Sequence, residues 1–231
     1  ESVVLPLDHS PNGTLQHSHP AGENKPLRWA FPVAAIGDGA MLGAETARRK
    51  MADVLKLAYF VTMKEGPSYL GGLLLTDTSG IPLDFRYTEP ITPTRLQSLL
   101  YGRALEPHLK EEVIQKTLLK ELKSAPDLFL LPPTELAGGW AGDTKCPVLA
   151  VQKTQEQPLA HTGETFRVSP RELLVQTADG APPLRVIFAA SLDMAAQDQA
   201  LPKILDAAYH MDLGEPLERV TAALQALLKP E

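Results

Sequence analysis

Cysteine is scarce in this 231-residue sequence: Cys146 is the single one. One cysteine excludes an internal disulfide and cannot supply a thiolate metal cage, so a reducing compartment is expected. Long apolar runs are also missing, because Lys, Asp or Pro interrupts each run well before the ~18 residues that span a bilayer. The composition therefore predicts a cytoplasmic protein with no membrane contact.

Positive charge is scarce as well. The chain has 22 Lys and Arg against 28 Asp and Glu, a net charge of −6. Residues 92–124 alone carry a small basic excess, and there the basic residues alternate with Glu, as in Glu112 and Lys116 four positions apart. Such spacing is typical of a solvated helix face with i,i+4 ion pairs. The charge pattern therefore predicts no nucleic-acid partner.

Known catalytic and metal-binding signatures are absent from the sequence. It has no His-Glu-x-x-His, no Cys-x-x-Cys pair, no EF-hand loop and no complete P-loop. Ser191 lacks the Gly-x-Ser-x-Gly context of a hydrolase nucleophile, and Ser191 to Asp193 reads better as a helix cap. His17 and His19 form a His-x-His pair, but a complete ligand set is not evident. We expect neither a cofactor nor a metal site.

Proline and glycine are dense in residues 1–27, which show no apolar periodicity. This composition predicts a flexible arm that also contains three of the six histidines. Residues 28–231 are predicted to form a single domain, with a possible subdivision near residues 132–145, where a Gly-rich loop follows two prolines.

Apolar spacing predicts the regular elements of this domain. A central helical segment is expected from Thr92, a capping residue before Pro93, to about Ser124, with a break near residues 102–107. Its apolar stripe begins with Leu96, Leu99 and Leu100. The other expected elements are strands at 29–36, 56–63, 69–76, 81–88, 127–131, 147–153, 172–177 and 184–190, a helix at 41–55, and two helices after about residue 199.

The predicted strands are joined mostly by hairpins and loops, which favours an α+β class over a doubly wound sheet. We expect a mostly antiparallel mixed sheet with the central helical segment and the two C-terminal helices packed on it. The hairpin at residues 72–85 superficially resembles the central hairpin of roadblock or profilin-like modules. That resemblance covers about fourteen residues and includes no diagnostic motif, so no family is assigned.

Two places are candidate partner-binding sites. Arg86, Tyr87 and Glu89 stand between a strand and a helix start, where a guanidinium and an aromatic ring can bind a partner; a solvent-exposed ion pair explains them equally well. Trp140 lies in the Gly-rich loop, where an exposed indole can anchor a partner. Asp77 is expected to organise a tight turn rather than to bind a cation.

The sequence accordingly predicts a noncatalytic adaptor of a cytoplasmic multi-component system, which binds a protein partner or forms a homo-oligomer. The alternative is a hydrolase that uses Cys146 as nucleophile and His161 as base. Pro147 directly follows Cys146, so no helix N-terminus is available to lower the pKa of the thiol. A structural role for Cys146 is therefore favoured.

Overall fold

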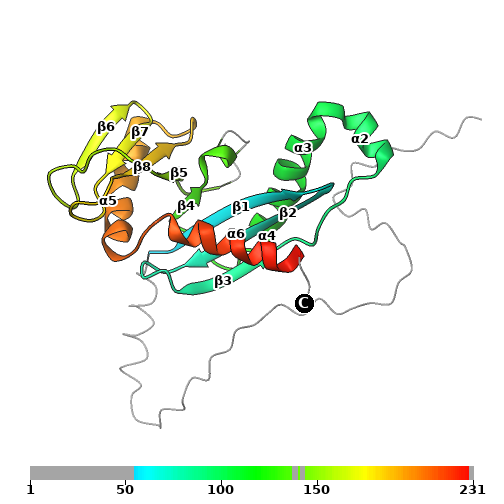
Figure 1. Ribbon diagram of the computed structural model, residues 1–231, viewed down its shortest axis with the longest axis horizontal. Coiled ribbons are helices and arrows are strands. Elements are labelled where there is room, and N and C mark those ends of the chain that lie inside the picture. The colour runs from blue at the N-terminus through cyan, green and yellow to red at the C-terminus, as the bar shows by residue number, and fades with distance from the viewer. Residues whose placement is uncertain (1–54, 137–139, 141–143, 229–231) are drawn as a thin grey trace, which may run out of the picture. The chain divides into compact units, whose positions relative to one another are not determined.

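The computed structural model describes residues 55–136, 140 and 144–228, all within a compact unit that spans Leu42–Glu231 (Figure 1). The predicted arm at residues 1–27 and the strand at 29–36 lie outside the described residues, as does nearly all of the predicted helix at 41–55.

An eight-stranded sheet forms the centre of the described region, in the order β3-β2-β1-β4-β5-β8-β7-β6. The pairs β1–β4 and β4–β5 are parallel and the other five pairs are antiparallel. This arrangement confirms the predicted α+β class and the mostly antiparallel mixed sheet. The strands are β1 (Leu57–Glu65), β2 (Ser68–Thr76), β3 (Pro82–Tyr87), β4 (Leu128–Leu131), β5 (Val148–Lys153), β6 (Thr165–Ser169), β7 (Glu172–Val175) and β8 (Leu184–Phe188).

Helices pack on both faces of this sheet. The two C-terminal helices, α5 (Met194–His210) and α6 (Glu215–Leu228), share one core cluster with the strands, and the central helical segment shares the other. The central segment consists of α2 (Arg95–Tyr101), η1 (Gly102–Ala104), α3 (Leu105–Pro107), the π-helical η2 (His108–Gln115) and α4 (Lys116–Glu121). A short 3-10 turn, η3 (Pro133–Glu135), follows β4.

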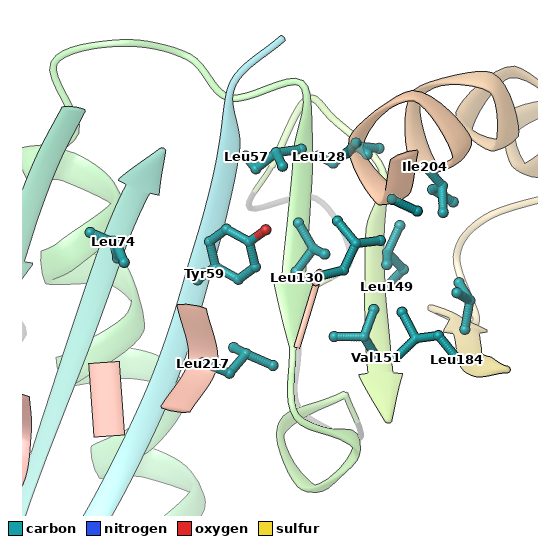
Figure 2. Packing of buried hydrophobic residues seen from close by; sticks show 14 of the residues in the cluster. Leu57, Tyr59, Leu74, Leu128, Leu130, Leu149, Val151, Leu184, Ile204 and Leu217 are labelled. Atoms are coloured by element: carbon teal, nitrogen blue, oxygen red, sulfur yellow. The ribbon is translucent and has the colours of Figure 1, made fainter. Parts of the chain in front are cut away.

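Alternation along β1 divides its side chains between the two cores. Tyr59 packs in the cluster that includes Leu130 and Leu217 of α6, as Figure 2 shows. Phe60, the next residue, packs in the other cluster, beside Ile114 of η2. Because both faces are covered, β1 and β4 read as continuous apolar runs, and each fully buried large side chain contributes about 1.5–3 kcal/mol.

Two successive glycines let a helix approach β2 closely on each face. A Cβ atom at Gly71 would clash with Ile114 Cγ2 of η2. A Cβ atom at Gly72 would lie 2.9 Å from Val220 Cγ1 of α6. The absence of side chains at these two positions therefore sets the distance of both helical layers from the sheet.

The β2–β3 hairpin has the predicted turn. Asp77 Oδ1 accepts hydrogen bonds from the backbone N–H groups of Ser79 and Ile81, both at 2.9 Å, and Gly80 adopts a φ of +76°. The carboxylate thus satisfies the turn's own backbone, which confirms the structural interpretation of Asp77.

The central helical segment departs from prediction at its start. Thr94, not Thr92, caps α2: its hydroxyl accepts from Gln97 N at 3.2 Å, and Gln97 Oε1 accepts from Thr94 N at 2.8 Å. This capping box satisfies two free N–H groups, whereas the Thr92 hydroxyl contacts Ser68 instead. No residue of α2 is buried, and Leu99 and Leu100 are 72% and 75% exposed, so the first part of the apolar stripe lies outside the core while η2 and α4 pack on the sheet.

The C-terminal region agrees better with prediction. Asp193 caps α5 by accepting from Ala196 N at 2.8 Å, as the Ser191 to Asp193 sequence suggested. The edge strand β6 was not predicted, because its exposed Phe166 and Val168 leave no buried pattern to detect. Among the described residues, no helix combines the length and apolar character needed to cross a membrane.

Candidate functional site

A polar cluster lies where β1 and β4 end. The two strands are parallel neighbours, and β4 ends one residue after Leu130, which lies opposite Tyr59, so the chain leaving β4 runs beside the second half of β1. Thr62 follows Phe60 on the η2 side of β1, and Glu135 closes the short turn after β4. In open sheets with parallel strands, ligands bind outside the carboxyl ends of the strands. Topology therefore identifies this region as the place to look for a site.

Glu135 is the central carboxylate of this cluster. Its side chain is 10% exposed, and its Oε1 accepts a hydrogen bond from the Thr62 hydroxyl at 2.5 Å. The Lys110 ammonium of η2 lies 3.6 Å from the same oxygen. The backbone carbonyl of Glu135 accepts from Trp140 Nε1 at 3.0 Å. Two segments thus contact the buried carboxylate, as a buried charge requires, and Trp140 holds the backbone of the same residue.

Glu106 provides a second carboxylate beside it. Lys110 Nζ lies 3.3 Å from Glu106 Oε1, and Lys64 Nζ of β1 lies 3.3 Å from Oε2. Tyr69 donates a longer hydrogen bond of 3.5 Å to Oε2. Partial burial raises the pKa of Glu106, but hydrogen bonds from Lys64 and Lys110 outweigh it and hold the pKa below its usual value. Glu106 is therefore ionised at neutral pH.

A cavity of about 430 Å³ opens onto both carboxylates. Arg103 and Lys110 bring positive charge to its wall, and the buried Gln115 brings an amide. This volume lies within the range of small-molecule and cofactor pockets, ~300–1,000 Å³. The lining residues are Arg103, Glu106, Pro107, Lys110, Glu111, Gln115, Thr134, Glu135 and Trp140.

Three carboxylates line the cavity, but the described residues do not assemble them into a metal site. Across residues 55–136, 140 and 144–228, no group of three or more His, Cys, Asp or Glu side chains is placed to hold a metal ion. Glu106 and Glu135 both contact the Lys110 ammonium instead. The arrangement can bind an anionic group through its cations and accept a proton through its carboxylates.

Trp140, a predicted binding residue, belongs to this site in an unexpected way. The indole is 3% exposed and packs edge-on against Phe60, with ring centroids 5.0 Å apart, and at a tilt against Phe129 at 5.6 Å. The expectation of an exposed ring on a loop is wrong, because the indole packs against these two aromatic side chains in an apolar environment. Trp140 instead holds the backbone of Glu135 through its hydrogen bond to the carbonyl oxygen.

The predicted cluster of Arg86, Tyr87 and Glu89 lies away from the cavity, at the end of edge strand β3. Arg86 Nε contacts the Asp84 carboxylate at 3.1 Å, and the Tyr87 ring lies 5.8 Å from that of Phe85. Tyr87 and Glu89 are exposed. A binding role for these three residues stays a prediction.

The structure does not bring Cys146 and His161 together. Cys146 precedes β5, whereas the turn after His161 contacts Gln176, beside the opposite end of β5. The six-residue strand separates these ends by about 20 Å. Burial, with a smaller effect from Asp127, raises the pKa of the Cys146 thiol to about 11, so it is protonated at neutral pH. His161 is exposed and lies 3.6 Å from Glu164.

The pocket itself was not found from sequence. Glu106, Lys110 and Arg103 were assigned to a solvated helix face, and Glu135 was left in a loop. One signal was available: Thr62 and Lys64 continue the alternation of a buried strand with polar residues, and Glu135 closely follows another buried strand. These signals converge only if β1 and β4 are known to be parallel neighbours.

Known proteins resemble this chain in structure rather than in sequence. A comparison with protein-family models finds no match, and a comparison with curated protein sequences finds none either. The structure of human ENDOV aligns with a TM-score of 0.52 and 10% identity, over 76% of this chain and 85% of that one. Endonuclease V from Streptomyces avermitilis aligns with a TM-score of 0.51 and 13% identity, over 80% and 92% of the two chains. These two likenesses show that the fold is one found in endonuclease V structures.

This finding contradicts the predicted function. A noncatalytic adaptor with a protein partner or homo-oligomeric contacts, and without nucleic acid, was expected, but the fold is shared with proteins named as nucleases. The prediction relied on the net charge of the chain and on missing motifs. Net charge averages over the whole surface and says little about one pocket, and motifs describe families rather than folds.

Proposed function

We propose that the protein is a nucleic-acid-processing hydrolase that acts at the cavity beside Glu135. The observation that supports this most is the position of a buried carboxylate at the carboxyl ends of two parallel strands, facing a cavity, in a fold shared with endonuclease V. A cytoplasmic location is part of the same proposal, since one partly buried thiol suits a reducing compartment.

Phosphodiester hydrolysis gives roles to Lys110, Arg103 and Glu135. Lys110 and Arg103 present cations to the phosphate oxygens, where negative charge grows in the transition state. In the described part of the chain, both contacts of the Glu135 carboxylate are made to Oε1, which leaves Oε2 to accept a proton. Water then cleaves one P–O bond: one of its protons passes to Glu135, its oxygen bonds to phosphorus, and the leaving oxygen takes a proton from solvent, to which Glu135 afterwards returns its own.

A cleavage assay tests this proposal. End-labelled single-stranded and duplex DNA and RNA are incubated with the wild-type chain, Glu135→Gln, and the control Glu112→Gln. Glu112 lies on the same helical segment but pairs with Lys116 and does not line the cavity. We expect wild type to cleave at least one substrate, Glu135→Gln to be slower by about 100-fold or more, and Glu112→Gln to match wild type. Absence of cleavage of every substrate, or equal rates for Glu135→Gln and wild type, would overturn the proposal.

A further inference from the structure

We infer that Lys110 stands in this pocket where a nuclease would hold a metal ion, so that the site works without a divalent cation. This inference rests on the proposed function for its catalytic meaning, but its geometric basis is independent. Nucleases commonly use two metal ions to activate water and to neutralise the phosphate. A metal ion can bind in this pocket only if the residues present supply its ligands and its charge.

The donor set does not suit a divalent cation. Mg²⁺ requires octahedral oxygen ligands at close distance, usually with at least one or two carboxylates free to coordinate it. Glu106 and Glu135 are the two carboxylates that share the Lys110 ammonium, and the described residues supply no third ligand in position. A metal ion would also have to displace an ammonium group from both carboxylates.

Lys110 occupies the bridging position instead. Its Nζ lies 3.3 Å from Glu106 Oε1 and 3.6 Å from Glu135 Oε1, so one ammonium joins carboxylates from two different segments. The other oxygen of Glu106 is matched by Lys64. Each carboxylate thus has a cationic partner within the protein, and the partly buried Lys110 holds its charge at a fixed point.

The charge balance supports the same conclusion. Glu106, Glu111 and Glu135 face Arg103 and Lys110 around the cavity, and Lys64 adds a third cation at Glu106. Among the residues that the structure describes around Glu106 and Glu135, acidic and basic groups are therefore equal in number, whereas a metal site needs an excess of negative charge to attract the ion. An ammonium group can stabilise developing negative charge on a phosphoryl oxygen, as a metal ion does.

Manganese binding to the full-length chain tests the inference without nucleic acid. MnCl₂ is titrated calorimetrically into wild type, Lys110→Met, and Lys110→Met combined with Glu135→Gln. We expect no saturable binding to wild type at millimolar concentrations. Lys110→Met leaves Glu135 without a cationic partner and Glu106 paired with Lys64 alone, so saturable binding should appear, at least tenfold tighter than in wild type, and the added Glu135→Gln should reverse the gain. Saturable binding to wild type that Glu135→Gln abolishes would overturn the inference, as would unchanged weak binding in Lys110→Met.

Two further measurements keep the test decisive. If Lys110→Met does not fold, Glu135→Gln in the wild-type background is titrated instead: Mn²⁺ binding to wild type that this variant loses contradicts the inference, and absent binding to both proteins supports it. Where cleavage is found, EDTA should change its rate less than twofold, and loss of cleavage in EDTA contradicts the inference. Absence of any cleavage would refute the proposed function, while the manganese titration would still decide the role of Lys110.

Discussion

Substitution of Gly71 by Ala tests how the helical layer over the site is positioned. A Cβ atom at this position clashes with Ile114 Cγ2 and lies 3.3 Å from Leu118 Cδ1, so η2 must move away from β2. Overpacking of this kind costs about 1–3 kcal/mol, and the lower entropy of the unfolded alanine chain offsets about 0.4–1 kcal/mol. We expect a net loss on the order of 1–2 kcal/mol, measured by urea denaturation.

A double-mutant cycle makes this prediction specific. Ile114→Ala removes the clashing methyl group and alone costs about 2–5 kcal/mol. Combined with Gly71→Ala, it should cost at least about 1 kcal/mol less than the sum of the single changes. Gly72→Ala is the matched control, because its Cβ meets Val220 and Leu224 on the other face and gains nothing from Ile114→Ala. Full stability of Gly71→Ala, or strict additivity in the cycle, would refute the packing described here.

Three further predictions concern single side chains. Trp140→Phe removes a buried hydrogen bond to Glu135 O, so it should lower stability by about 1–3 kcal/mol in urea titrations and slow cleavage; an unchanged stability would contradict the contact. Since the pKa of Cys146 rises from 9.0 to about 11, its thiolate fraction at pH 8 is about 100-fold below that of a free thiol, and alkylation by iodoacetamide should be correspondingly slow. Alkylation of the folded protein at the rate of the urea-unfolded chain would refute this. Leu99→Gln with Leu100→Gln should change stability by less than about 0.5 kcal/mol, because both side chains are exposed; a larger loss would mean that they are covered.

Local patterns predicted much of the fold. The β1–β2–β3 meander, the buried strands β4 and β5 and the β7–β8 hairpin lie within a few residues of their predicted positions. Each of these elements has a signal in its own sequence, either continuous apolar character or a turn with Asp and Gly. The exposed leucines of α2 show the limit of such signals, since helical spacing alone does not say whether anything packs over the helix.

The site could not be predicted in the same way, because its residues come from distant segments. Thr62 and Glu135 are 73 positions apart in sequence and meet only because β4 pairs in parallel with β1. Lys110 reaches them only because η2 lies close above β2, which Gly71 permits. Pairing of β1 with β4 depends on long-range packing that no local pattern in either strand encodes.

The position of bound nucleic acid tests the central claim most directly. Addition of a short oligonucleotide to the isotope-labelled chain should shift the amide NMR signals of residues that line the cavity, namely Arg103, Glu106, Lys110, Glu111, Gln115, Thr134, Glu135 and Trp140. Signals of the β2–β3 turn at residues 77–81, which lies at the opposite end of β1, should stay unchanged. Shifts that gather at that turn, or an oligonucleotide that moves no signal around Glu135, would contradict the account.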